Sequence, residues 1–119
     1  ILIGTGSETP ICVQAYEQLT SEGIKVRVVS MPSWELFEKQ DEVYRHEVLP
    51  PRVRARVAVE KAAAFGWERY VGLDGQIVAL RTFGASAPLA ELQKKFGFTA
   101  DNVAAAARAQ VKKARETFL

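Results

Sequence analysis

Residues 1–10, ILIGTGSETP, decide the fold of this chain. The first three are large and apolar, which is typical of a strand buried on both faces in a parallel sheet. A turn of small residues, Gly-Thr-Gly-Ser at positions 4–7, follows, and a helix is predicted directly after it. A strand that ends in a glycine turn and leads into a helix is the first half of a βαβ unit. We therefore expect an α/β domain built around this strand.

Length and composition are those of one ordinary globular domain. The chain has 119 residues, of which 48% are hydrophobic and 25% charged, as in soluble domains of this size. Its formal net charge of +2 arises from 16 basic and 14 acidic residues, a balance that argues against nucleic-acid or membrane partners. No apolar run reaches the ~20 residues of a membrane span. Cys12 is the only cysteine, which excludes an internal disulfide and fits a reducing compartment.

The chain begins inside the predicted strand, without an initiator Met or a leader segment. We expect from this that residues 1–119 are a single domain and a fragment of a longer protein. A targeting segment would then have been lost with the rest. The expected location is cytoplasmic, or a plastid if the source is a photosynthetic eukaryote.

The spacing of apolar residues predicts the other elements. Further strands are expected at residues 25–31, 55–60 and 76–83. In the first half of the chain, helices are expected at residues 8–22, in a short stretch that Ser33 caps at its start, and at 41–48. In the second half, they are expected at 62–65 and 67–71, from Pro88 to Gly97, and from a cap at Thr99 or Asp101 to about Ala114. Val103, Ala107 and Val111 would form the inner stripe of the last helix. The Asp74-Gly75 pair leaves a second arrangement open, a hairpin that pairs residues 70–73 with 77–80.

The turn at residues 4–7 is the best candidate for a binding site. The free N–H groups at the start of the following helix would point at it, so Thr5, Gly6 and Ser7 could hold an anion. The stretch lacks the third glycine of a dinucleotide fingerprint, because that position is Thr9, and it lacks the Gly-Lys-Ser/Thr of a P-loop. The plainer interpretation is that small residues merely let the chain turn.

Other polar residues give weaker signals. Ser7 is not flanked by glycines as in a nucleophile elbow, and His46, the only histidine, is expected at the surface rather than as its base. Cys12 lies on an apolar helix stripe, so a small buried hydrophobic side chain is favoured over a reactive thiol. Arg52, Arg54 and Arg56 alternate into a strand and are assigned to a solvated face rather than to a phosphate.

Acidic and aromatic residues likewise favour structural roles. No metal-ligand spacing joins the acidic residues Asp41, Glu42, Glu47 and Glu60. The aromatic residues Trp34, Phe37 and Tyr44 are expected in the core, or in contact with an absent domain, rather than on a binding platform. We therefore assign no metal site to the chain.

Several stretches taken together resemble the C-terminal domain of transketolase. The most recognisable is VVSMPSWELF at residues 28–37. It is accompanied, in the same order, by matching runs at residues 3–8, 40–41, 44–45, 48–50, 55–60, 70–72, 82–88 and 96–99. These runs keep their order and spacing over nearly the whole chain.

The resemblance implies a fold. The third domain of transketolases has three α/β/α layers and a mixed sheet whose first strand is antiparallel to the rest. That strand would precede Ile1, leaving four parallel strands in the order second, first, third, fourth. We therefore expect a mostly parallel sheet of about four to five strands, with the second strand at an exposed edge.

The resemblance also implies a function for a parent protein. Transketolases are homodimers that transfer a two-carbon ketol unit between sugar phosphates, using thiamine diphosphate and a divalent cation such as Mg²⁺ or Ca²⁺. The family's catalytic and cofactor-binding residues lie in the N-terminal and middle domains. None of them maps onto this sequence, so no catalytic, cofactor-binding or metal-ligating residue is carried over. The domain would pack against those two domains and support the homodimer without a cofactor of its own.

Two alternatives remain open from the sequence. One is a regulatory α/β module that binds a phosphate or nucleotide at Thr5, Gly6 and Ser7. The other is a free-standing flavodoxin-like enzyme.

Overall fold

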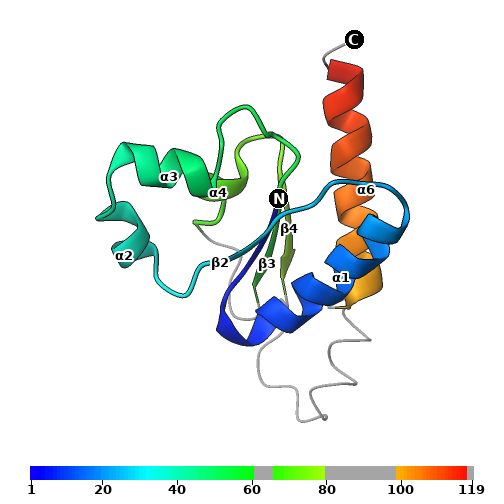
Figure 1. Cartoon of the computed structure of the whole chain (residues 1–119), viewed down its shortest axis with the longest axis horizontal. Helices are drawn as coiled ribbons and strands as arrows, with labels where there is room; N and C mark the ends of the chain where they lie inside the picture. The colour runs from blue at the N-terminus through cyan, green and yellow to red at the C-terminus, as the bar shows by residue number, and fades with distance from the viewer. Residues whose placement is uncertain (61–65, 80–98, 118–119) are drawn as a thin grey trace.

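The computed structural model describes residues 1–60, 66–79 and 99–117, and in these ranges a sheet of four parallel strands forms the centre of the molecule (Figure 1). The order across the sheet is β2-β1-β3-β4. Its strands are β1 (Leu2–Gly4), β2 (Val28–Ser30), β3 (Val57–Glu60) and β4 (Gln76–Ala79). The predicted strand order and the parallel direction are confirmed, and β1 is an inner strand.

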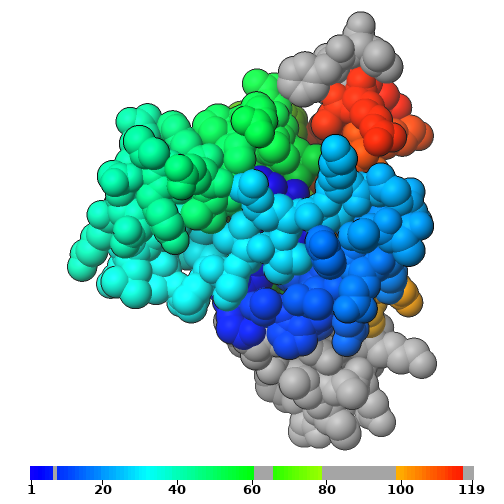
Figure 2. Space-filling model, viewed as in Figure 1, coloured from blue at the N-terminus to red at the C-terminus, as the bar shows by residue number. Residues whose placement is uncertain are grey.

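Helices cover both faces of the sheet. They are α1 (Thr9–Ser21), α2 (Trp34–Glu38), α3 (Glu42–Val48), α4 (Glu68–Val71) and α6 (Ala100–Thr117), with a 3-10 turn, η1 (Gly6–Glu8), before α1. Figure 1 shows α1 and α6 on one side of the strands and α2, α3 and α4 on the other. In the space-filling view of Figure 2, the segment that contains α2 and α3 forms a lobe at one side of the molecule.

Two apolar clusters hold these layers together. Successive side chains of a strand point to opposite faces, so Leu2 and Ile3 enter different clusters. Leu2 packs with the buried stripes of α1 and α6, which include Leu19 and Val103. Ile3 packs with side chains from the region of α2 to α4, among them Trp67. Burial of these side chains on both faces gives the predicted three-layer α/β/α fold.

Side chains cap the starts of three helices; Ser33 was predicted as a cap, whereas Asp41 was expected inside its helix. The Ser33 side chain accepts a hydrogen bond from Leu36 N at 3.2 Å, and Asp41 Oδ1 accepts one from Tyr44 N at 2.8 Å. Thr99, rather than Asp101, caps the last helix through its hydroxyl, which accepts from Asn102 N at 3.3 Å. Such caps satisfy N–H groups that have no partner within the helix. Helix α6 runs to Thr117, beyond the predicted end.

Two expectations about strands are corrected. The second and third strands are shorter than predicted, because both pair with β1, which starts at Leu2 opposite Val28 and Val57. The hairpin alternative is wrong, since β4 pairs in parallel with β3 and Tyr70 lies in α4. A Cβ at Gly75 would meet Val71 O at 2.3 Å, so this turn needs glycine to pass α4. The helices predicted at 62–65 and 88–97, and the strand beyond Ala79, lie outside the described residues.

Candidate functional site

The chain reverses its direction of winding between β1 and β3. From β1 the chain crosses through α1 to β2 on one side, whereas β3 is followed by β4 on the other. Ligands of open α/β sheets bind at such a switch point, outside the carboxyl ends of the strands. The turn that follows β1 lies there, as does Glu60, the last residue of β3. This edge is therefore the expected position of a ligand site.

The turn at residues 4–7, the candidate anion site of the sequence analysis, forms part of this edge. Thr5 has an extended backbone and precedes η1, which contains Gly6 and Ser7. Gly6 has a φ of +20°, at the border of the region that favours glycine. The carbonyl of Thr5 accepts a hydrogen bond from Glu8 N at 2.7 Å, so one N–H at the helix start is already bound by the chain itself.

Carboxylates surround the Thr5 side chain. Its hydroxyl donates to Glu8 Oε2 at 2.7 Å and lies 3.4 Å from Glu60 Oε2. The same Glu60 oxygen accepts a hydrogen bond from Trp67 Nε1 at 3.2 Å. Glu8 is buried, with 3% of its surface exposed. Two carboxylates thus contact the hydroxyl beside which a phosphate at Thr5 would lie, and like charges repel.

The sequence analysis did not predict that the side chains of Glu8, Glu60 and Trp67 come together. Glu8 directly follows the glycine turn, and Glu60 ends the third strand. Because the carboxyl ends of neighbouring parallel strands meet at one edge, the predicted strand order contained a signal for this pairing. No metal centre results: in the ranges 1–60, 66–79 and 99–117, no group of three His, Cys, Asp or Glu side chains could hold a metal ion.

Cys12 lies directly behind the turn. Its side chain is fully buried, and a Cβ added at Gly4 would lie 3.0 Å from its sulfur. Burial, with a smaller contribution from the charge of Glu8, raises the pKa of the Cys12 thiol to about 12. The thiol is therefore protonated at neutral pH, which confirms the interpretation of Cys12 as a small buried hydrophobic side chain.

An aromatic cluster fills the opposite face of the sheet. Trp34 meets Trp67 edge to face with ring centroids 5.0 Å apart, and Phe37 meets Tyr70 at 5.6 Å. Trp34 and Phe37 are half-buried against the core, as predicted. Tyr44 contacts the cluster through Phe37 but is 46% exposed. The deepest members, Trp67 and Tyr70, were not predicted as its centre.

The prediction that Arg52, Arg54 and Arg56 share a solvated face is wrong for Arg56. Arg52 and Arg54 are exposed, but the guanidinium of Arg56 is half-buried and donates to four carbonyls. These are Tyr70 O at 2.7 Å, Val53 O and Pro50 O at 2.8 Å, and Leu49 O at 3.3 Å. Burial lowers the pKa of this guanidinium. Arg56 thus ties the segment after α3 to the end of α4.

His46 lies at the surface, as expected. It is on α3 with half of its side chain exposed, and its Nε2 is 3.8 Å from Glu42 Oε1.

Within the described part of the chain, no helix is both long and apolar enough to cross a membrane.

Comparison with known proteins gives one consistent family. Residues 1–99 match the family model described as "Transketolase-like TK C-terminal domain". Transketolase 1 of Escherichia coli strain K12 is 58% identical over 108 residues, which are 91% of this chain and 16% of that protein. The structure of transketolase from Leishmania mexicana superposes with a TM-score of 0.86 and 43% identity over 94% of this chain and 16% of that one.

In one further solved structure, the match covers a larger share of the solved chain. It is described as "Split gene transketolase, inactive beta4 tetramer" and matches with a TM-score of 0.65 and 27% identity. The match covers 93% of this chain and 38% of that chain. The family model spans most of the sequence, and the matching structures share the parallel sheet and its helices. The chain therefore belongs to the transketolase family, in which it corresponds to the C-terminal domain.

Proposed function

We propose that residues 1–119 are a single domain at the C-terminal end of a longer transketolase chain. The observation that carries this proposal is that the chain spans 16% of the length of the E. coli transketolase it matches. In that whole protein, the proposed reaction transfers a two-carbon ketol unit between sugar phosphates. The proposed location is cytoplasmic, or a plastid in a photosynthetic eukaryote.

The cofactors of the whole protein would be thiamine diphosphate and Mg²⁺ or Ca²⁺. The carboxyl edge of this sheet does not fit a diphosphate, because Glu8 and Glu60 stand where N–H donors or cations would be needed. We therefore assign the cofactor and the catalytic residues to the N-terminal and middle domains.

The role proposed for this domain is to pack against those two domains and to support a homodimer. Three large apolar side chains on α2 and α3 support this role: Leu36, Val43 and Tyr44 are 61%, 69% and 46% exposed. Leu36 and Tyr44 line a shallow hollow of about 160 Å³ beside the edge strand β2. Exposed apolar groups that gather in one place mark a surface which another part of a protein covers.

The split-gene relative supports the same role. Its chain, of which the match covers 38%, is described as an inactive β4 tetramer. Self-assembly of a chain that contains a domain of this fold is what we expect if the domain supports a homodimer. The alternative, a regulatory phosphate site at Thr5, Gly6 and Ser7, is disfavoured by the two carboxylates at that turn.

Division of the parent protein tests the proposal. The segment that precedes residue 1 is expressed alone, this chain is expressed alone, and the two are mixed with thiamine diphosphate, Mg²⁺ and a ketose and an aldose phosphate. We expect no ketol transfer from this chain alone and the highest activity from the mixture. Ketol transfer by this chain alone would contradict the proposal.

A further inference from the structure

A second depression lies at the opposite end of the sheet from the turn after β1. It is a groove of about 630 Å³ between α3, α4 and the segment that joins α3 to β3. Arg56, just before β3, and Leu73, shortly before β4, both line it. The groove therefore opens at the amino ends of β3 and β4, and nothing in the proposed function uses it.

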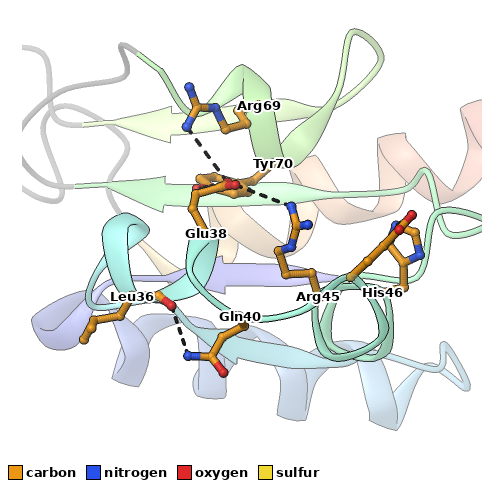
Figure 3. Close-up of polar contacts among 8 residues, drawn as sticks. Leu36, Glu38, Gln40, Arg45, His46, Arg69 and Tyr70 are labelled. Carbon is orange, nitrogen blue, oxygen red and sulfur yellow. Dashed lines mark hydrogen bonds and ion pairs between the residues drawn. The ribbon is translucent and has the colours of Figure 1, made fainter.

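Two arginines of the groove share one carboxylate, as Figure 3 shows. Arg45 Nη1 lies 3.5 Å from Glu38 Oε2, and Arg69 Nη1 lies 3.9 Å from Glu38 Oε1. Tyr70 also donates its hydroxyl to Glu38 Oε1 at 2.8 Å. A single negative charge thus faces two guanidinium groups. In addition, Nε of Arg45 is buried and has no hydrogen-bond partner within the described residues.

Arg56 adds a further positive charge at the wall of the groove. Carbonyl oxygens fix its orientation, and they carry no formal charge. Among residues 1–60, 66–79 and 99–117, no carboxylate forms an ion pair with it. The other acidic side chain of the groove, Asp74, pairs with Lys113 at 3.3 Å. The three positive charges of Arg45, Arg56 and Arg69 exceed the one negative charge of Glu38 by two. A concave surface concentrates the electric field of these charges.

The remaining wall of the groove is apolar. Phe37, Val53 and Val71 line it, and the side chain of Leu73 is fully exposed at it. The volume falls within the ~300–1,000 Å³ that is usual for small-molecule sites, and is much larger than a phosphate ion requires. Guanidinium groups bind phosphate through paired charge-assisted hydrogen bonds. An apolar body attached to the phosphate would cover the rest.

We propose that this groove binds a small phosphate ester, with the phosphate held by Arg45 and Arg69 and the organic body against Val71 and Leu73. This site is independent of the proposed role in domain packing. It is also distinct from the sequence-based candidate at Thr5, Gly6 and Ser7, which lies at the other edge of the sheet.

The test is a titration of the ¹⁵N-labelled chain with phenyl phosphate, inorganic phosphate and phenol, followed by NMR. Assigned amide signals of Gly72 and Leu73 should shift with saturation below about 10 mM phenyl phosphate, as for a weak small-molecule site. Inorganic phosphate should bind more weakly, and phenol should leave these signals in place. Shifts confined to Thr5 and Gly6, or none, would overturn the proposal.

Charge variants sharpen the test. Arg69→Gln should weaken phenyl phosphate binding by about five-fold or more, because it removes a charge-assisted contact. Arg115→Gln removes the same charge from an exposed position of α6 and should change the affinity by less than about two-fold. Glu38→Gln keeps an acceptor for Tyr70 but frees both arginines, so it should strengthen binding. Equal effects of Arg69→Gln and Arg115→Gln, or weaker binding by folded Glu38→Gln, would contradict the site.

Discussion

The hydroxyl of Thr5 donates a 2.7 Å hydrogen bond to the carboxylate of Glu8, and this contact occupies the place in the fold where an α/β domain would bind a ligand. Glu8 is buried, so its carboxylate depends on donors from the protein. This hydrogen bond spans the turn of small residues that connects β1 to α1, so it stabilises that turn. Loss of this hydrogen bond should therefore lower the stability of the fold.

The first prediction concerns Thr5 itself. Thr5→Ala removes one donor to the buried Glu8 carboxylate, so the free energy of unfolding should fall by about 1–3 kcal/mol. Thr5→Ser keeps the hydroxyl and should lose less than half as much. Urea unfolding followed by circular dichroism measures both variants. Equal losses for Ala and Ser would show that the methyl group, rather than the hydrogen bond, matters.

The second concerns the buried guanidinium of Arg56. Lysine cannot reproduce a planar fork that reaches Val53, Tyr70 and Pro50 at once. Arg56→Lys should therefore lower the free energy of unfolding by about 2–4 kcal/mol. The matched variant Arg52→Lys changes an exposed side chain and should stay within about 0.5 kcal/mol of the parent chain. Similar values for the two variants would refute the anchoring role.

The third concerns the pH dependence of stability. Cys12 has a pKa of about 12 in the folded chain against 9.0 as the ordinary value, so the unfolded state loses its proton first. The stabilising contribution is complete below pH 9 and is lost as the pH rises to 12. The slope should reach about 1.4 kcal/mol per pH unit. Cys12→Ala should remove this part of the slope, while Tyr70, whose pKa burial also raises, continues to contribute in both chains. Unchanged slopes would refute the assignment.

The same property predicts slow thiol chemistry. A native chain at pH 8 should react with a disulfide reagent far more slowly than the chain in urea, because the folded thiol is buried and protonated. The rate is followed by absorbance. Fast reaction of the folded chain would mean that Cys12 is accessible.

Local patterns predicted the order of elements well, because each signal is short-range. The apolar run before Gly4, the cap Ser33 and the turn before β4 depend on neighbours in the sequence. Strand lengths were overestimated for a different reason. A ladder extends only as far as its partner, and the start of β1 at Leu2 cannot be read from residues 25–31.

The candidate sites show the limit of such patterns more clearly. Arg52, Arg54 and Arg56 have the same chemistry and spacing, yet Arg52 and Arg54 are exposed. The half-buried Arg56 donates to four backbone carbonyls that lie up to 14 residues away. The approach of Arg45 and Arg69 to Glu38 joins three helices. Contacts of this kind depend on how the layers pack, which hydrophobic periodicity does not specify.

The most direct test of the central claim, that this domain packs but does not catalyse, is the steady-state rate of ketol transfer by the full-length protein carrying Glu60→Gln or Ser7→Ala. Both residues lie at the carboxyl edge where a catalytic site of this sheet would be. We predict kcat/KM within about two-fold of the parent enzyme for each folded variant. A loss of about 100-fold or more, the size expected for a general acid or base, with folding and cofactor binding intact, would contradict the account.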